Sequence, residues 1–456
     1  MKKQFKKVIA TALVSAMACS LVACGGGASG GGSSSDASSS AGEDSSSSSQ
    51  DSSSSGGQVE ISLYTTIPGK DPEFEEIVAD FMEANTDVKV NYIAYDSSEK
   101  QKWMTLYSGG NAPTVSIMDA IDILDNVDNM ATFSADDEVL QGIDSSYTDV
   151  FTVDGNIYGV PDAVQAMGII YNKTTIEKAT GETFDPASIK CISDLEALCE
   201  KIQAGGVAPL MLTGVDWSLG SHFLSQAFTG IRGGAQEQEA FIASVKDGSV
   251  DFKSDAGFNG VMDTFDVFAK YNYNAKDPLV GNTDIDGQAI ANGDVAMWFM
   301  GDWGWSYVSS IANGEDEYGL MAVPLTDNAG DAINQQLGVF PAKGFCLDKS
   351  QNDDAQQAAG KRLIQFIMKD DAQKMADLLE TALPYADADV NYTSPLVGST
   401  QSYVESGNTY STYAFSSLLP SDFWSENGAT MQQYLSGQIS REQAGDAIQN
   451  YWKAQQ

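Results

Sequence analysis

Hydrophobic and polar positions along the chain follow two different periods. Residues 59–64 alternate as a strand does, and apolar side chains within residues 74–82 recur three and four positions apart, as on one face of a helix. The apolar runs 88–93 and 114–118 follow, with a helical stretch around Trp103 between them. Strand, helix, strand, helix, strand is the rhythm of a parallel sheet covered by helices. The pattern predicts an α/β fold in which the loops after the strands line a cleft.

Short apolar runs and helical patterns continue through the rest of the chain. Residues 157–173 form a strand-like segment, a polar patch and a second apolar strand, and residues 209–212 form another short strand. Residues 440–443 read Ser-Arg-Glu-Gln, the form of a capping box at a helix start. Ser193 followed by Glu196 predicts a second capped helix of this kind.

The stretch Asn292–Trp305 combines a buried strand with side chains suited to a small polar guest. The apolar run 295–300 is short enough for a buried strand, and Asp302, Trp303 and Trp305 follow it directly. Indole faces suit the apolar face of a sugar ring, and a carboxylate accepts hydrogen bonds from its hydroxyls. The alternative is that both indoles are core residues, since Trp is largely buried in most proteins.

The first residues of the chain have the pattern of an export signal. Lysines at positions 2, 3, 6 and 7 precede the apolar run Val8–Ala18, which is too short to span a membrane. Leu21-Val22-Ala23-Cys24 followed by Gly25 resembles the box of bacterial lipoproteins. This resemblance implies that residues 1–23 are a signal peptide and that Cys24 carries lipid. The alternative is an ordinary signal peptide with a chance cysteine.

The segment 24–57 is composed almost entirely of Gly, Ser, Asp and Glu after its first residue. It has no apolar face to bury, so we expect a disordered tether. With lipid on Cys24, the protein would be held at the outer face of the bacterial cytoplasmic membrane.

Composition excludes several kinds of partner. The chain of 456 residues has 63 acidic against 25 basic residues and a formal net charge of −38. Such a surface repels nucleic acid and anionic lipid headgroups, so we expect no nucleic-acid partner.

Histidine and cysteine usage argues against metal or cofactor chemistry. The single histidine, His222, argues against a His-rich metal site, and we expect no cofactor, no metal and no catalytic residue. Beyond the export segment, cysteines stand at positions 191, 199 and 346. A bridge between Cys191 and Cys199 stays open, but three buried free thiols are favoured.

Two motifs resemble one protein family. The segment Tyr158-Gly159-Val160-Pro161, followed by Gly168-Ile169-Ile170-Tyr171-Asn172-Lys173, is similar to the lobe crossover of extracellular solute-binding proteins of ABC importers. The resemblance is to the sugar-binding, maltose-binding-protein-like group, whose Ala-Met-x-x-x-Gly-x-Trp segment is matched by residues 296–303. It extends over nearly all of residues 58–456 and implies a two-lobed, type II periplasmic-binding-protein-like fold with hinge crossings.

The resemblance also implies where the lobes begin and end. Residues 58–164 and 342–398 would form lobe 1, and residues 165–341 and 399–456 would form lobe 2, with a second crossing at 337–345. Ligand would bind between the lobes, and closure would signal occupancy to the permease of the importer.

The candidate ligand-binding residues come from two sources. The family's stacking aromatics fall on Trp303 and Trp424, its polar contact at the crossover falls on Gln165, and its loop aromatic falls near Trp217. Loop position and side-chain chemistry add the remaining candidates, which are Asp302, Asp216, Asp162, Asp119, Thr66, His222, Trp305 and Tyr385.

The sequence supports three functional hypotheses. The first is a monomeric, lipid-anchored receptor that binds a sugar or oligosaccharide and delivers it to an ABC transporter permease. The second is a solute-binding protein for a cationic ligand, polyamine or betaine, because carboxylates and indoles also form cages for cations. The third is a secreted glycoside hydrolase, which requires two carboxylates about 5–10 Å apart. No motif indicates such a pair, and we expect a binding protein rather than an enzyme.

Overall fold

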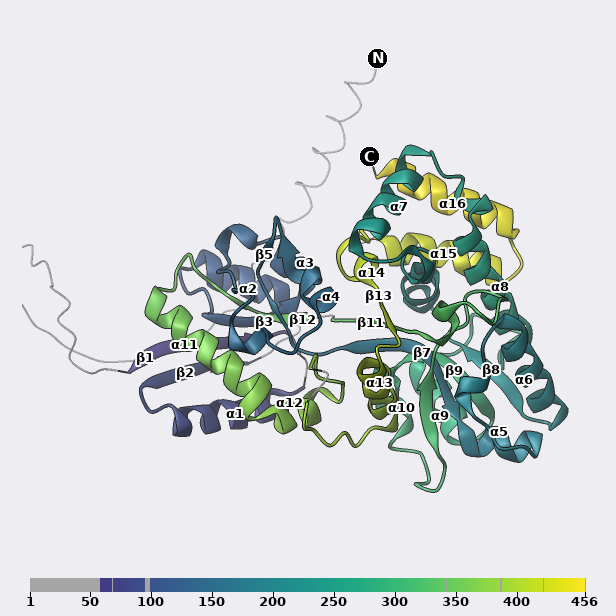
Figure 1. Ribbon diagram of the computed structural model, residues 1–456, viewed down its shortest axis with the longest axis horizontal. Helices are drawn as coiled ribbons and strands as arrows, with labels where there is room; N and C mark the ends of the chain where they lie inside the picture. Colours follow the sequence, from purple (N-terminus) through teal and green to yellow (C-terminus); the bar gives the residue numbers. More distant parts are fainter. Residues whose placement is uncertain are drawn as a thin grey trace, which may run out of the picture. The chain divides into compact units, whose positions relative to one another are not determined.

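The computed structural model describes residues 58–67, 69–94, 99–341, 343–385, 388–420 and 422–455 (Figure 1). The predicted signal peptide, the lipidated Cys24 and the tether lie outside the described residues. Within the described residues, no helix combines the length and the apolar character needed to cross a membrane.

The first sheet has the strand order β2-β1-β3-β12-β6. Strand β1 (Val59–Thr65) pairs in parallel with β2 (Val88–Ile93) and β3 (Val115–Asp119). Strand β12 (Lys343–Leu347) pairs antiparallel with β3 and with β6 (Val160–Pro161). The three parallel strands confirm the rhythm predicted from the hydrophobic pattern.

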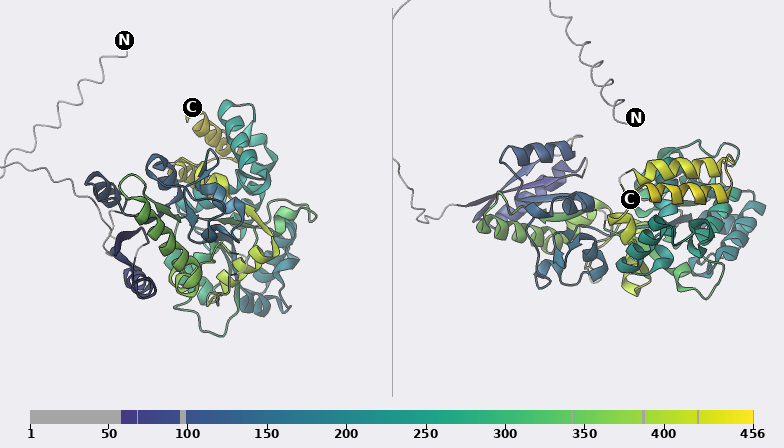
Figure 2. Two further views of the ribbon diagram at one scale, coloured as in Figure 1. Left: turned by 60° about the vertical axis from the view of Figure 1, so that its left-hand side comes forward. Right: turned by 90° about the horizontal axis from the view of Figure 1, so that it is seen from above.

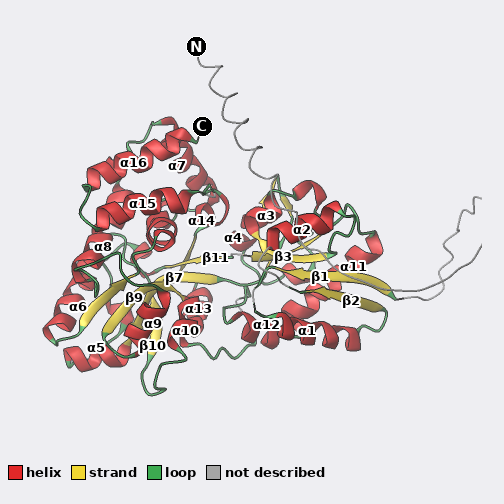
Figure 3. Ribbon diagram, turned by 180° about the vertical axis from the view of Figure 1, so that it is seen from behind, coloured by secondary structure: helices red, strands yellow, loops and turns green. Residues whose placement is uncertain are grey.

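Helices cover both sheets (Figure 3). Those of the first sheet bury an apolar stripe, as Phe74, Ile77, Val78 and Phe81 do in α1. Their bounds are α1 (Asp71–Ala84), α2 (Glu99–Ser108), α3 (Ala120–Leu124), α4 (Ser145–Thr148), η4 (Asp149–Phe151), α11 (Asp354–Gln365), η12 (Phe366–Asp370) and α12 (Ala372–Leu379).

The second sheet has the order β13-β11-β7-β9-β8, and β10 also pairs with β7. All seven residues of its strand β9 are buried, as expected for a strand covered on both faces. The strands are β7 (Gln165–Asn172), β8 (Ala208–Leu212), β9 (Val295–Gly301), β10 (Tyr318–Met321), β11 (Leu337–Phe340) and β13 (Thr409–Ser411).

The second sheet carries most of the helices. Figure 2 shows the C-terminal helices in yellow lying beside one another, in accord with the packing of α15 on α16. The bounds are α5 (Lys173–Thr180), α6 (Ile192–Ala204), η6 (Trp217–Phe223), α7 (Ala235–Asp247), α8 (Ala256–Tyr271), α9 (Thr283–Ala291), η10 (Asp302–Gly304), α10 (Trp305–Val308), α13 (Pro395–Ser406), α14 (Tyr413–Ser417), α15 (Phe423–Leu435) and α16 (Arg441–Ala454).

One of the two predicted capping boxes is present. Ser440 caps α16 reciprocally with Gln443, as predicted. The cap predicted at Ser193 is wrong, because α6 begins one residue earlier, at Ile192, and has no side-chain cap. In a capping box the Glu196 side chain would accept the Ser193 N–H, but here this N–H donates to the side chain of Asp327 at 2.8 Å.

Within the part of the chain that the structure describes, three passages join the two sheets. The chain leaves the first sheet after β6 and enters the second at β7, and it returns between β11 and β12. The third passage follows α12 and leads to α13, which packs along β10. At this passage the Val164 N–H donates to the carbonyl of Ala382 at 2.7 Å, so the first and third passages are hydrogen-bonded to each other.

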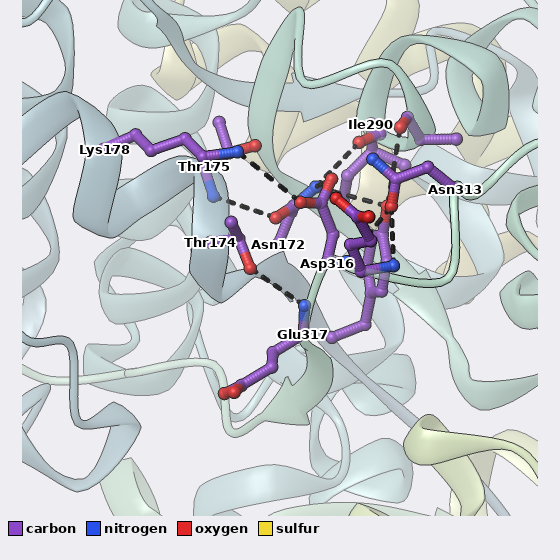
Figure 4. A network of polar contacts seen from close by, with 11 residues as sticks. Asn172, Thr174, Thr175, Lys178, Ile290, Asn313, Asp316 and Glu317 are labelled. Carbon is purple, nitrogen blue, oxygen red and sulfur yellow. Dashed lines mark hydrogen bonds and ion pairs between the residues drawn. The ribbon is translucent and has the colours of Figure 1, made fainter.

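Asn172 fixes the far end of β7 (Figure 4). Its side-chain oxygen accepts the Thr175 N–H at 2.9 Å and so caps α5. Its side-chain nitrogen donates to the Ile290 carbonyl at 3.3 Å and to Asp316 at 3.4 Å. The asparagine of the crossover motif therefore has a structural role, at the end of the strand away from Gln165.

The described cysteines are not bridged. Cys191, Cys199 and Cys346 are buried free thiols, which confirms the favoured prediction. Burial raises the pKa of the Cys346 thiol to about 12, so it remains protonated and unreactive at neutral pH.

Candidate ligand-binding site

Five aromatic side chains of the second sheet and its loops contact one another and define what we call the aromatic cluster. His222 lies edge-to-face against Trp217, with ring centroids 5.1 Å apart, and against Trp303, at 5.3 Å. Phe415 lies 5.8 Å from His222 and 4.8 Å from Phe340, and Phe340 lies 6.1 Å from Trp303. These separations fall in the range of favourable aromatic pairs. The single histidine of the chain is therefore the ring that contacts most of the others.

The end of β9 is built to hold Trp303 in this cluster. The strand ends at Gly301, and a Cβ there would collide with the six-membered ring of the Trp303 indole. Glycine thus allows the indole to fold back over the end of its own strand. Phe340 is the last residue of β11, and Phe415 lies in α14.

The strand register places Gln165 on the same side of the sheet as Phe340. The two residues are directly opposite in the antiparallel pair of β7 and β11. Directly opposite residues point to the same face, and successive residues alternate between faces. Gln165 therefore lies beside the aromatic cluster.

His222 presents a polar edge inside this apolar setting. Its imidazole forms no hydrogen bond to any described residue, whereas its backbone carbonyl accepts one from the Ser225 hydroxyl. Burial lowers the pKa of the imidazole to about 4, because the charged form is poorly solvated there. At neutral pH the ring is uncharged, and its nitrogens can bond one donor and one acceptor of a guest.

A second group, which we call the lysine cluster, lies at the ends of β1 and β3. The Lys343 ammonium is 2.6 Å from Asp119 and donates to the Thr66 hydroxyl at 3.1 Å. Burial raises the pKa of Asp162 to about 7, and the charge of Lys343 opposes this rise. Thr66 and Asp119 were predicted from loop position and Asp162 from its place near Gln165 at the crossover, but Lys343 was not predicted. No local pattern singles it out, because the pairing of β12 with β3 puts it opposite Asp119.

A cavity of about 170 Å³ adjoins the lysine cluster and reaches Gln165. Lys343, Asp162 and Gln165 line it together with Lys70 and Thr381. Four larger cavities, of about 210 to 350 Å³, are lined by none of the residues of either cluster. Among these five cavities of the described residues, the one at Gln165 is lined by predicted residues.

Asp302 lies beneath the site rather than in it. The residue is 0% exposed, and its carboxylate accepts a hydrogen bond from the Thr400 hydroxyl at 2.9 Å. Burial raises the pKa of Asp302 to about 7, against the lowering effect of that hydrogen bond. A residue without exposed surface cannot touch a guest, so the role of Asp302 is to hold the turn that carries Trp303 against α13.

Two further predicted residues lie away from both clusters. Trp305 packs edge-to-face on Tyr318, which is paired with the far end of β7. Tyr385 is 4% exposed, and its hydroxyl donates to the Val139 carbonyl at 2.8 Å. The structure does not bring Trp305 and Tyr385 together with Trp303.

The remaining two candidates flank η6, the π-helical turn that carries Trp217 and His222. Asp216 precedes it, and its carboxylate accepts the Trp217 N–H at 2.8 Å. Trp424 is 43% exposed in the first turn of α15, and its carbonyl lies close to Gly220 of η6. Trp424 is thus the most accessible of the candidate indoles.

Among the described residues, no group of three or more His, Cys, Asp or Glu side chains is arranged to hold a metal.

The chain belongs to the bacterial extracellular solute-binding proteins, whose family model matches residues 76–388. It is also similar to an uncharacterized ABC transporter extracellular-binding protein, PH1214, from Pyrococcus horikoshii, with 27% identity over 229 residues. That match covers 50% of this chain and 46% of the relative, so the chain spans about half the length of the relative that it matches.

Solved structures share the two-lobed fold. A family 1 extracellular solute-binding protein from Bifidobacterium longum subsp. infantis has 20% identity and a TM-score of 0.69, covering 88% of this chain and 100% of its own. The apo-form of RafE from Streptococcus pneumoniae has 17% identity and a TM-score of 0.72, covering 88% and 99%. RafE in complex with raffinose gives a TM-score of 0.67 at 16% identity, covering 87% and 99%. These likenesses confirm the fold class predicted from the sequence.

Proposed function

We propose that this protein is an extracellular receptor that binds a sugar or oligosaccharide between two lobes and delivers it to an ABC transporter permease. The observation that carries the proposal is the aromatic cluster around the uncharged His222. Sugar rings have apolar C–H faces and a rim of hydroxyls, and the cluster offers flat apolar surface with an unpaired polar edge. The similarity to RafE, which has been solved with raffinose, supports the same ligand class.

The lysine cluster supplies the polar half of the proposed site. The ion pair of Lys343 and Asp119 presents both a charged donor and a charged acceptor, which suits hydroxyl groups in either direction. Because Lys343 neutralises Asp119, this arrangement favours a neutral guest over a polyamine. The cationic-ligand hypothesis therefore becomes the weaker alternative.

We propose lobe closure as the signal of occupancy, with lobe 1 at residues 58–164 and 342–398 and lobe 2 at 165–341 and 399–456. The aromatic cluster belongs to the second sheet and the lysine cluster to the first, so a guest that touches both would hold the lobes together. The proposed boundary at 398 divides α13, and because this whole helix packs against β10 of the second sheet, the passage between the lobes ends before Pro395.

A thermal-shift screen tests the proposal. Raffinose and other neutral oligosaccharides, with spermidine and betaine for the alternative, are added to the purified protein. We expect one carbohydrate to raise the melting temperature, and Trp303→Ala to abolish this rise while the protein stays folded. Trp305→Ala is the matched control, because that indole packs at the other end of β7, and it should keep the rise. A response to spermidine or betaine alone, weakened by salt, would favour the cationic ligand.

The anchor is a separate proposal, since Cys24 lies outside the described residues. We propose that lipid on Cys24 holds the receptor at the outer face of the cytoplasmic membrane, with the protein monomeric. Cys24→Ser should release it into the medium or leave it unprocessed at the signal peptide, as an immunoblot of membrane and culture fractions would detect. Membrane retention of a processed Cys24→Ser protein would contradict the lipid anchor.

A further inference from the structure

The segment that carries Trp217 and His222 lies against α15 at backbone-to-backbone distance. A Cβ added to Gly220 would lie 2.5 Å from the Gly428 nitrogen and 2.6 Å from the Trp424 carbonyl oxygen. A Cβ added to Gly428 would lie 2.7 Å from the Cα of Asp216 and closer still to its carbonyl oxygen. The atoms in the way are all backbone, so no side-chain rotation would relieve the overlap.

These contacts form one stripe along α15. Trp424, Gly428 and Gln432 follow at intervals of four residues, which places them on a single face of the helix. The Gln432 side chain donates to the Gly214 carbonyl at 2.9 Å, one turn beyond Gly428. The segment from Gly214 to Gly220 therefore contacts α15 at three successive turns of the helix.

The supported segment has an unusual local conformation. Residues 217–223 form a π-helical turn, which is uncommon and is held here by tertiary contacts rather than by its own preference. Gly220 lies between Trp217 and His222 in the sequence. The distance between the Gly220 backbone and α15 therefore sets the positions of the Trp217 and His222 rings in the aromatic cluster.

We propose that Gly220 and Gly428 are positioning residues of the ligand site. The missing side chains let η6 settle on α15, and this places His222 between Trp217, Trp303 and Phe415. A methyl group at either position pushes η6 away from α15 and moves His222 out of the cluster. The consequence for sugar affinity rests on the proposed function, whereas the consequence for His222 does not.

The decisive measurement follows the imidazole of His222 by NMR in tag-free protein. His222 is the only histidine in the chain, so its signals need no assignment. In the wild type, the three flanking rings should displace these signals from those of an exposed imidazole. In Gly428→Ala we expect the signals to move toward the exposed position and the pKa to rise from about 4 toward the ordinary value of about 6.5.

Gly398→Ala is the matched control. Gly398 also lies within a helix, α13, but a Cβ there would meet nothing within 4 Å. This variant should leave the His222 signals unchanged. Unchanged His222 signals in a folded Gly428→Ala protein would overturn the proposal.

Two further measurements keep the outcome decisive. If Gly428→Ala does not fold, Gln432→Ala removes one tie without adding atoms, and it should shift the same signals in the same direction by a smaller amount. No shift there would also overturn the proposal. Titration with raffinose, or with whichever sugar the screen identifies, should show at least tenfold weaker binding by Gly428→Ala. Shifted His222 signals in a protein that binds no sugar would leave the positioning role intact and contradict the proposed function alone.

Discussion

Phe340 and Lys343 lie three residues apart on the passage from β11 to β12, yet their side chains belong to the two different clusters. The Phe340 ring contacts Trp303 and Phe415, and the Lys343 ammonium contacts Asp119. A single short passage thus begins at an apolar ring on the second sheet and ends at a charge on the first. A change in the conformation of this passage would therefore alter the distance between the two clusters that a guest contacts.

Replacement of Lys343 tests the polar half of the site. Lys343→Met removes the charged donor and leaves Asp119 without its partner, so we expect sugar affinity to fall about tenfold to a hundredfold, from about 1.5–3 kcal/mol for hydrogen bonds to charged groups. Isothermal titration calorimetry measures this. Lys361→Met is the control, because Lys361 also pairs with an aspartate, Asp137, at 2.7 Å, in a part of the first lobe outside both clusters. Equal losses in the two variants would contradict a role of Lys343 in binding.

His222→Phe separates packing from hydrogen bonding. Phenylalanine keeps a ring between Trp217 and Trp303 but removes both nitrogens. We expect the melting temperature to change little and sugar affinity to fall about fivefold to tenfold, the effect of about one lost hydrogen bond. Binding by His222→Phe at the wild-type level would show that the imidazole serves the cluster only by its shape.

The buried carboxyl group of Asp302 makes stability depend on pH. Its pKa is about 7 in the folded protein and about 3.9 in an unfolded chain. Between these values the folded protein holds a proton that the unfolded chain has lost. The resulting stabilisation is fully present below pH 4 and is lost as pH rises through 7, because the ionised carboxylate must then remain buried.

Asp302→Asn should remove this dependence. We expect the variant to match the wild type near pH 4 and to exceed its free energy of unfolding by about 4 kcal/mol at pH 8, since a difference of about three pKa units corresponds to that free energy. Urea unfolding at both pH values provides the comparison. Asp294→Asn, at the exposed other end of β9, is the control and should show no such divergence. A variant that is less stable than wild type at pH 8 would mean that the ionised form is well solvated in place.

A buried relay supports the loop before η6. The Trp298 indole N–H donates to the Thr213 hydroxyl at 2.9 Å, and this hydroxyl donates to Asp286 at 2.7 Å. Thr213→Val leaves a buried donor and a buried carboxylate without partners, so we expect a loss of about 2–5 kcal/mol in the free energy of unfolding. Thr213→Ser keeps the hydroxyl and should lose far less. Similar losses in both variants would assign the effect to packing of the methyl group.

The local sequence pattern was sufficient to predict those elements whose structure depends only on residues near one another in the chain. The parallel strands, the buried run before Gly301 and the capping box at Ser440 follow from side-chain spacing and cap chemistry. The cap predicted at Ser193 failed because Asp327, distant in sequence, takes the amide that a local cap would satisfy. Loop position alone indicated Asp119 and Thr66, because residues after parallel strands collect at one edge of a sheet.

The grouping of the predicted side chains depended on contacts that no local pattern contains. Trp303 and Trp305 are two residues apart, yet the Trp303 indole contacts His222 and the Trp305 indole contacts Tyr318. The short turn η10 between them points the two side chains in different directions. Asp302 looked equally suited to bind a guest and is buried against Thr400 of α13.

The sequence by itself determined the α/β class, the identity of most strands and the residue types available for a sugar. Periodicity and cap chemistry are properties of neighbouring residues, so they can be read without knowing the fold. The tertiary structure decided that His222 stands among three aromatic rings, that Lys343 meets Asp119, and that Gly428 allows η6 to approach α15. Each of these contacts joins segments far apart in the chain, and strand register together with backbone approach sets their distance.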